Sequence, residues 1–248
     1  MQYKTSFLFV LKEAVKKVLK SGPVGKLVYP LFQRPYRAYA IPMKQRRLKR
    51  HGVAALQRVG NVLKANNVEF YEDYGTLLGF IRDNGFIPHD DDIDITIMPG
   101  TIKSQRLLKI LMDAGFGFIH GFNYKGQLIE FTIADSSQIT IDFFFPSRDS
   151  KNPNVFNFYI PDWVPEHQYP SEKANDVILT PYIGAKGIQD YNVMGVSVRI
   201  PSNYEEVLES EYGPWRVPDP NFQYKDDSKV LKQEGFAYRL TKEEALAL

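Results

Sequence analysis

The 248-residue chain contains no cysteine. This absence excludes a disulfide framework, a metal site built on thiolates and a cysteine nucleophile. It also agrees with a reducing compartment. Internal repeats and low-complexity segments are missing too. Hydrophobic residues make up 44% of the chain and aromatic residues 14%, which is enough for a packed core. We therefore expect one fairly large domain, or one domain with an appendage.

Long apolar runs are also absent. No stretch approaches the roughly 18 to 20 apolar residues that cross a bilayer as a helix. The apolar run from Phe7 to Leu11 is too short for a secretory signal and leads directly into Lys12. Histidines are few, and His51, His89, His120 and His167 are too scattered to predict a metal cluster. These features favour a cytoplasmic protein.

Charge is distributed unevenly along the chain. Residues 1–50 hold thirteen Lys or Arg and one acid, so their net charge is +12, whereas residues 51–248 hold eighteen bases and twenty-eight acids, a net −10. We predict a basic N-terminal extension over 1–50 and a folded domain over 51–248. Residues 5–20 are predicted to form an amphipathic helix, which could lie on an anionic membrane surface or pack on the body. Nucleic acid is not expected, because an acidic body repels phosphates.

From residue 51 the pattern is that of an α/β (α+β) protein with a mixed β-sheet flanked by helices. A strand pair is expected over 176–201, a long ordered excursion over 146–176, and a peripheral, partly helical segment over 225–248. A capping signature from Ser202 to Glu205 marks the start of the last predicted helix. The other expected elements are helices at 53–67, 76–84, 104–115 and 202–213, and strands at 68–75, 93–99, 116–122, 127–135 and 138–146.

Four aspartates crowd into five positions, at Asp90, Asp91, Asp92 and Asp94. A chain tolerates such crowding only where water or a cation neutralises it. If 92–98 is a strand, Asp92 and Asp94 share one face while the isoleucines between them are buried on the other. Asp90 and Asp91 could instead belong to a simple solvated turn. A helix-loop-helix calcium site is poorly supported, because Ile95 stands where that loop needs glycine.

Asp142 is a lone acid in the apolar segment ITIDFFF, where an unpaired charge would cost several kcal/mol. A neighbouring strand could place it beside Asp92 and Asp94. Three carboxylates suit magnesium or manganese. The sequence thus predicts a metal site formed by Asp92, Asp94 and Asp142.

Gly75 and Thr76 stand between a predicted strand and a short helix. Glycine allows a phosphate to approach the backbone, and free amides at a helix start bind anions. Arg82, near the end of that helix, could bind a phosphate in a bidentate way. These three residues are candidates for binding a phosphorylated ligand.

The segment YGTLLGFIRDNGFIPHDDDIDI closely resembles the signature of the LicD/fukutin family of phosphotransferases, a branch of the nucleotidyltransferase-fold superfamily. That pattern is Gly-Ser or Gly-Thr on a turn, then D-x-D, then a third acid on a later strand. Gly75-Thr76, Asp92-x-Asp94 and Asp142 match it here. The resemblance spans about residues 68–218. His89 stands where family members usually carry tryptophan, which makes it a candidate for a role on the acceptor side.

The resemblance implies transfer of a phospho-substituent from a CDP-activated donor, such as CDP-choline, CDP-ribitol or CDP-glycerol, to a glycan or lipid-linked oligosaccharide of the cell surface. Asp92, Asp94 and Asp142 would hold magnesium, and one of them could take the proton of the acceptor hydroxyl. Gly75, Thr76 and Arg82 would position the diphosphate. The charge of residues 1–50 further predicts that this extension holds the enzyme at the inner face of the cell membrane, near a lipid-linked glycan.

Two other interpretations remain at this stage. A D-x-D glycosyltransferase also uses aspartates and a divalent ion, but it gives no reason for the Gly-Thr turn or the third aspartate strand. A pseudoenzyme or carbohydrate-binding module with structural calcium is the non-catalytic alternative. The aromatic residues over 144–170 could then stack on sugars, or could be ordinary core.

Overall fold

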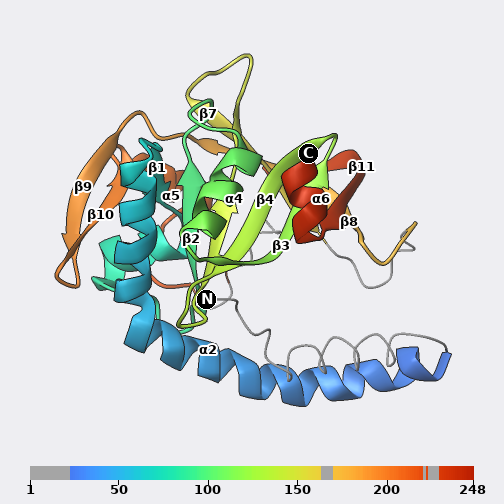
Figure 1. The fold of residues 1–248 in the computed structure, drawn as a ribbon. Coiled ribbons are helices and arrows are strands. Elements are labelled where there is room, and N and C mark those ends of the chain that lie inside the picture. The colour runs from blue at the N-terminus through green and yellow to red at the C-terminus, as the bar shows by residue number, and fades with distance from the viewer. Residues whose placement is uncertain (1–22, 163–169, 220–221, 223–228) are drawn as a thin grey trace.

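A computed structural model describes residues 23–162, 170–219, 222 and 229–248. Its main feature is a nine-stranded mixed sheet in the order β1-β2-β5-β4-β3-β11-β8-β7-β6, with a separate β9–β10 hairpin (Figure 1). The strands of the large sheet are β1 (Phe70–Glu72), β2 (Asp92–Ile97), β3 (Gly117–Tyr124), β4 (Gln127–Ala134), β5 (Thr140–Phe144), β6 (Ser147–Arg148), β7 (Val155–Asp162), β8 (Ala174–Ile183) and β11 (Leu231–Leu240). The hairpin strands are β9 (Ile188–Val193) and β10 (Val196–Pro201). The helices are α2 (Pro23–Ala65), α3 (Tyr74–Leu78), the π-helix η1 (Gly79–Asp83), α4 (Ser104–Asp113), α5 (Tyr204–Tyr212) and α6 (Lys242–Ala247). This architecture confirms the predicted fold class.

The long helix α2 joins the two predicted parts of the chain. The helix expected at 53–67 exists, but it begins thirty residues earlier and runs through residue 50, where we placed the domain boundary. Leu48 is only 1% exposed and belongs to the core together with Leu56 and Leu63, which follow it at helical spacing. The last residues of the basic extension therefore pack into the core of the body. The helix predicted over 5–20 lies outside the described residues. No helix in the described part of the chain is apolar enough over a sufficient length to span a membrane.

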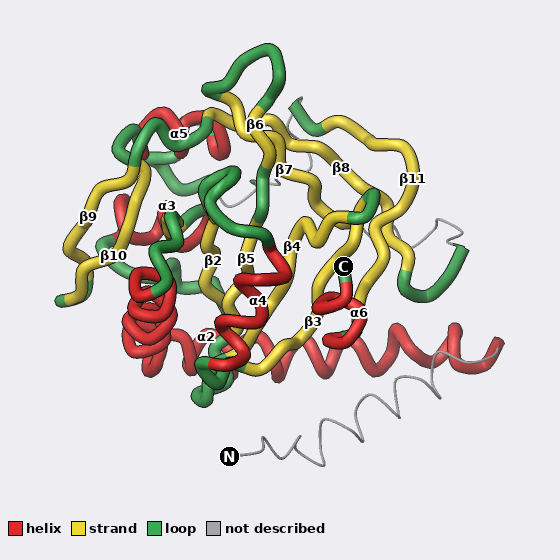
Figure 2. Tube along the Cα trace, turned by 45° about the horizontal axis from the view of Figure 1, so that its top comes forward, coloured by secondary structure: helices red, strands yellow, loops and turns green. Residues whose placement is uncertain are grey.

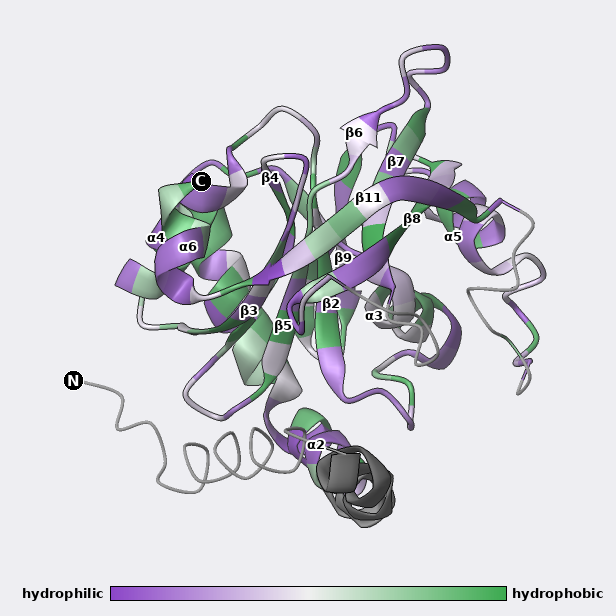
Figure 3. Ribbon diagram, turned by 90° about the vertical axis from the view of Figure 1, so that its right-hand side faces the viewer, coloured by the Kyte–Doolittle hydropathy of each residue, from purple (hydrophilic) through white to green (hydrophobic). Residues whose placement is uncertain are grey.

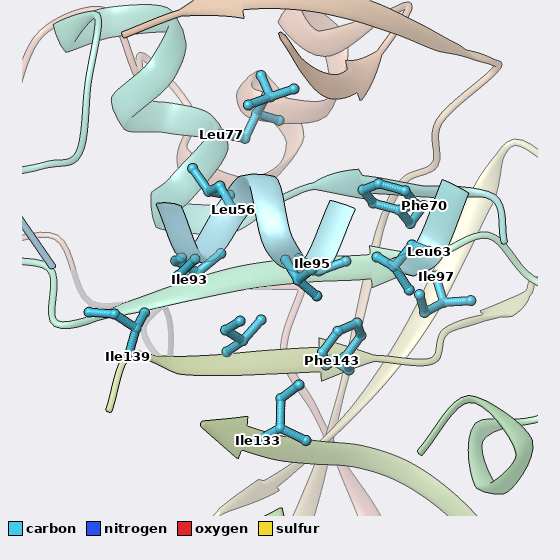
Figure 4. Packing of buried hydrophobic residues seen from close by; sticks show 14 of the residues in the cluster. Leu56, Leu63, Phe70, Leu77, Ile93, Ile95, Ile97, Ile133, Ile139 and Phe143 are labelled. Atoms are coloured by element: carbon cyan, nitrogen blue, oxygen red, sulfur yellow. The ribbon is translucent and has the colours of Figure 1, made fainter. Parts of the chain in front are cut away.

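The core lies on one face of the central strands. Figure 4 shows Ile93, Ile95 and Ile97 of β2 beside Phe143 of β5, with Leu56 of α2 packed above. The three isoleucines are at most 2% exposed. Hydrophobic residues gather on these inner strands, whereas the helix surfaces alternate between hydrophobic and hydrophilic (Figure 3). As predicted, the aspartates of β2 therefore lie on the face opposite the isoleucines.

The large sheet curls strongly. Strands β4 and β7 lie close together although β3, β11 and β8 separate them in the sheet order. Helix α5 adjoins β8 and α3 at one end of this curl, and α2 passes the opposite end, where β2 and β5 begin (Figures 1 and 2). The face of β2 and β5 that carries the aspartates therefore borders a partly enclosed space.

The predicted peripheral position of the C-terminal segment is wrong. Strand β11 pairs with both β3 and β8 in the middle of the sheet. Most of its side chains are exposed, and a register shift between Gln233 and Ala237 interrupts it. The segment therefore lacks the alternating apolar pattern that predicts a strand. Its position in the sheet depends on backbone pairing with β3 and β8. The helical part is confirmed as α6, which begins with a capping box formed by Thr241 and Glu244.

Three smaller expectations need correction. The segment 146–176 is not only a loop excursion, because it contains β7. The segment 176–201 forms parts of three strands rather than a pair. Helix α5 begins after Asn203, whose side chain makes no capping bond with the helix, so the predicted Ser202–Glu205 cap does not form. Asn203 instead accepts a hydrogen bond from the Lys186 backbone N–H at 2.9 Å.

Candidate active site

The acidic residues of β2 and β5 come together through strand register. The two strands pair in parallel, and Asp94 lies directly opposite Asp142, with Asp92 opposite Thr140. Because residues in register on neighbouring strands share a face, all three carboxylates lie on the same side of the sheet. The predicted placement of Asp142 beside the D-x-D pair is confirmed. Its role as a metal ligand stays a prediction.

These carboxylates resist ionisation. Burial, reinforced by Asp142 and Asp91, raises the pKa of Asp92 to about 8. Burial and the neighbouring Asp92 raise the pKa of Asp94 well above its usual range. Burial likewise raises the pKa of Asp142 to about 6, although a hydrogen bond with the Thr132 side chain opposes the shift. Like charges this close favour the binding of a cation or a proton.

The donor set fits a hard divalent cation, because it consists of carboxylates and the buried Oδ1 of Asp142 has no hydrogen-bond partner among the described residues. The side chains are not yet arranged around a common point. Over the described ranges, no group of three or more histidine, aspartate or glutamate side chains meets the geometry of a metal site. Binding of a cation would therefore require these carboxylates to turn toward one another.

The predicted phosphate-binding residues have partners within the protein. Thr76 is 1% exposed, and its Oγ1 accepts a hydrogen bond from the Asp94 backbone N–H at 2.9 Å. Thr76 thus ties α3 to the acidic strand. The Arg82 guanidinium donates two hydrogen bonds of 2.9 Å to the Asp83 carboxylate. Both residues therefore contribute to the protein scaffold around the cluster.

Two glycines in this segment allow close approaches. A Cβ at Gly75 would stand 3.0 Å from Oδ2 of Asp90, so that carboxylate, rather than a ligand, occupies the space beside the glycine. A Cβ at Gly79 would lie only 2.5 Å from the Gly85 carbonyl oxygen. Since real Cβ atoms do not approach backbone oxygen that closely, glycine at 79 is required for η1 to pack on the following turn.

Helix α2 holds the two loops that lead into the acidic strands. Lys44 Nζ lies 2.8 Å from Oδ2 of Asp91. The neighbouring Gln45 donates a hydrogen bond to the His89 carbonyl at 2.8 Å, and Arg47 donates one to the Gln138 carbonyl at 3.2 Å. The solvated-turn interpretation therefore fails for Asp90 and Asp91, which are both partly buried. Lys44 belongs to the cluster, although nothing in its basic stretch distinguished it from its neighbours.

Sequence reasoning also missed three buried acids close to this site. Glu130 of β4 is 9% exposed, and burial together with Asp142 raises its pKa to about 8. Asp73 and Glu211 form a second buried pair, in which burial raises the pKa of Asp73 to about 6. Glu130 is a lone acid in an apolar strand, the same signal that identified Asp142, so it could have been found. Glu211 stands in an ordinary acidic helix and gave no such signal.

Two cavities adjoin the cluster. The first, of about 550 Å³, includes Asp94, Glu130 and Glu211 in its lining together with several aromatic rings. The second, of about 790 Å³, is lined in part by Gly75, Arg82, His89 and Asp90. Tyr212 and Phe222 line both cavities. The arrangement offers two adjacent spaces that a pair of substrates could occupy.

Comparison with known proteins places this geometry in a family. The family model described as "LicD/FKTN/FKRP, nucleotidyltransferase domain" matches residues 67–203. Ribitol-5-phosphate transferase FKTN of Homo sapiens is 23% identical over 191 residues, which are 73% of this chain and 36% of that protein. An uncharacterized protein of Rickettsia typhi is 31% identical over 114 residues, covering 45% of this chain and 35% of its own. The chain thus spans about a third of the length of these curated relatives.

Among solved structures, a lincomycin-bound lincosamide antibiotic adenylyltransferase aligns with a TM-score of 0.35 and 13% identity, over 60% of this chain and 78% of that one. A likeness at this TM-score supports no structural conclusion. The family match covers more than half of the chain and includes the Gly75-Thr76 turn, the D-x-D strand and Asp142. The chain therefore belongs to the LicD/FKTN/FKRP family of nucleotidyltransferase domains.

Proposed function

We propose that this protein transfers a phospho-substituent, either phosphocholine or a polyol phosphate such as ribitol or glycerol phosphate, from a CDP-activated donor to a hydroxyl of a cell-surface glycan and releases CMP. The observation that carries the proposal is the register of β2 and β5, which sets Asp94 opposite Asp142 with Asp92 on the same face. The family match and the relative named as a ribitol-5-phosphate transferase support transfer of a substituted phosphate.

In this scheme Asp92, Asp94 and Asp142 hold one or two magnesium ions, with manganese as a substitute. When bound there, magnesium neutralises negative charge on the diphosphate and on the departing CMP. A cation bound there would stabilise the charged forms of the three carboxylates. One of them, or the nearby Glu130 once it has lost its own proton, would accept the proton of the attacking hydroxyl.

The donor diphosphate fits best at the cavity of about 790 Å³, where Arg82 and His89 contribute to the lining. Arg82 carries the positive charge that a phosphate needs, and a donor that bound there would compete with Asp83 for its guanidinium. Thr76 acts indirectly, because its hydroxyl fixes the backbone of Asp94. Gly75 keeps room for Asp90 beside the start of α3.

Asp94→Asn tests the scheme. The protein is incubated with magnesium and, in turn, CDP-choline, CDP-ribitol, CDP-glycerol and UDP-glucose, while release of CMP or UDP and donor-induced thermal stabilisation are measured. We expect CMP release from one CDP donor, and a loss of roughly a thousandfold in Asp94→Asn, since about 4 kcal/mol of transition-state stabilisation is removed.

The control is Asp190→Asn. Asp190 lies on the hairpin strand β9, its side chain is 71% exposed, and its Oδ1 is 3.8 Å from Nζ of Lys64. Activity of Asp94→Asn within tenfold of the wild type would refute the metal role. UDP release in place of CMP release would favour a D-x-D glycosyltransferase. The absence of both, without donor-induced stabilisation, would favour a non-catalytic glycan-binding protein.

The charge of residues 1–50, +12, supports a second part of the proposal, namely that this extension holds the protein at an anionic membrane surface on the cytoplasmic side. Sedimentation with anionic liposomes tests it. Full-length protein should bind them, and a variant that lacks residues 1–43 should bind less, because it loses eight of the thirteen basic side chains of the extension but keeps the buried Leu48. Equal binding of the two proteins rules the idea out.

A further inference from the structure

The cavity of about 550 Å³ beyond Asp94 has no task in the donor chemistry described above. Its walls come from β2, β3, β4 and β5 on one side, from β7 and β8 on the other, and from α5. We propose that this cavity binds the neutral saccharide portion of the acceptor. The assignment rests on the proposed function, because it names the subsite of the second substrate of that reaction.

Position supports the assignment. Asp94 forms part of the cavity wall and lies in register with Asp142. A hydroxyl at the inner end of a saccharide in this cavity therefore lies beside the carboxylates that bind the donor's metal. An attacking group must be held near the reacting centre in this way for transfer to be efficient.

The two cavities differ in the charged residues that line them. The cavity lining carries the acids Asp94, Glu130 and Glu211, and its lining among the described residues contains no lysine, arginine or histidine. A phosphorylated ligand would find no cationic side chain there to pair with its charge, and burial of an unpaired charge is costly. The neighbouring cavity of about 790 Å³ has Arg82 and His89 in its lining. The diphosphate therefore belongs to the second cavity, and the first remains for a partner without negative charge.

The walls also match the surfaces of sugar rings. Six aromatic residues line the cavity, and two of them, Tyr74 and Phe144, meet edge to face with ring centroids 4.9 Å apart. Rigid aromatic faces pack against the apolar C–H faces of a saccharide, while a few placed polar groups fix its orientation. The remaining aromatic lining residues are Phe122, Tyr182, Tyr212 and Phe222.

Hydrogen-bonding groups stand on several sides of the space. Glu130 lies on β4, Asn175 on β8 and Glu211 on α5. Two polar atoms of lining residues, Oη of Tyr74 and Oε2 of Glu211, are buried without a hydrogen-bond partner in the described part of the chain. Such groups are costly unless a ligand or water pairs with them.

The placement of these polar groups favours a neutral ligand with several hydroxyls over a cationic one. Hydroxyls on several sides of a ligand can form hydrogen bonds with polar groups on all three walls. A trimethylammonium group has no hydrogen-bond donor for them, and choline would fill only a small part of a cavity of this drug-sized volume.

Saturation-transfer NMR tests the proposal on the full-length protein without metal or donor. The probes are maltose, cellobiose, lactose and N,N′-diacetylchitobiose, with glucose 6-phosphate as the anionic probe and choline chloride as the cationic probe. Ile160→Trp places a large ring into the cavity from β7. Leu231→Trp is the matched control, because Leu231 is 50% exposed on the neighbouring sheet surface and does not line the cavity. Asn175→Trp provides a second blocking variant if Ile160→Trp does not fold, as judged by circular dichroism.

We expect saturation transfer to at least one disaccharide with the wild type and Leu231→Trp, a loss of at least tenfold in the blocking variant, and none to glucose 6-phosphate. No signal from any disaccharide, or an unchanged signal in the blocking variant, would overturn the proposal. Choline binding that the blocking variant abolishes, without saccharide binding, would instead assign the cavity to the transferred group.

The two proposals can fail separately. Saccharide binding that Ile160→Trp abolishes, together with no nucleotide release from any donor, would contradict only the proposed reaction. CMP release to water without saccharide binding would contradict only the cavity assignment.

Discussion

The two faces of strands β2 and β5 differ in what their side chains do for the fold. On one face Ile93, Ile95, Ile141 and Phe143 are fully buried against other apolar groups. On the other, burial and the neighbouring carboxylates raise the pKa values of Asp92 and Asp94, and burial raises that of Asp142. Successive residues of one strand thus belong in turn to the apolar core and to the candidate acidic site. The acidic face therefore lowers the stability of the fold, whereas the apolar face raises it.

Phe143→Ala should have the largest effect on folding. The ring is fully buried and stacks on Phe131 with centroids 5.0 Å apart, so its removal should lower the free energy of unfolding by about 3–5 kcal/mol. Urea denaturation measures this change. Phe144→Ala, one residue further on the cavity face, is the matched control and should cost clearly less. Equal losses would show that the two faces do not differ in stabilisation.

Asp142→Asn should have the opposite profile. Nucleotide release should fall roughly a thousandfold, equivalent to about 4 kcal/mol. The melting temperature should stay the same or rise, because removal of a buried charge relieves repulsion with Asp92. Calorimetry and the donor assay measure the two effects. The exposed Asp113→Asn is the control, and a large drop in melting temperature for Asp142→Asn would show that the carboxylate is structural.

Glu72→Gln probes a buried acid of β1. Glu72 is 2% exposed and accepts a hydrogen bond from the Arg199 backbone N–H at 2.7 Å, yet burial raises its pKa to about 7. The folded state therefore holds this proton more tightly than the unfolded state, where the pKa is 4.5. The resulting stability is fully present below pH 4.5 and is lost as pH rises from there through 7, by about 3 kcal/mol in total.

In Glu72→Gln this loss should disappear, while the amide oxygen can still accept the hydrogen bond from Arg199. Urea denaturation at pH 5 and pH 8 compares the variant with the wild type. Parallel pH dependence in the two proteins would show that Glu72 ionises normally.

Lys44→Gln should have the smallest effect on folding. Its side chain is 40% exposed and that of its partner Asp91 is 28% exposed, so the pair should contribute under about 1 kcal/mol to stability. Its positive charge interacts with Asp91, Asp92 and Asp142. Removal of this charge should tighten manganese binding several-fold in an electron paramagnetic resonance titration. Lys109→Gln, from the exposed Lys109–Asp113 pair, is the control, and unchanged affinity in Lys44→Gln would place Lys44 outside the metal's field.

The sequence predicted most of the central sheet because its strands are short alternating or apolar runs between turn residues. The same alternation placed Asp92 and Asp94 on the face opposite the isoleucines. Two parts of the fold escaped prediction. Strand β11 has mostly exposed side chains, and its place between β3 and β8 depends on backbone pairing with distant segments. Helix α2 crosses a change in composition at residue 50 without interruption.

By itself, the sequence determined the D-x-D strand, the lone acid at 142 and the family pattern around Gly75, because each depends on residue type and local spacing. The tertiary structure alone decided that Lys44 joins the acidic cluster and that Glu211 lines the same cavity as Asp94. Local spacing fixes which face of a strand a side chain occupies, whereas the neighbours of that face depend on sheet order and curvature. These bring together residues as distant in sequence as Lys44 and Asp91, which are 47 positions apart.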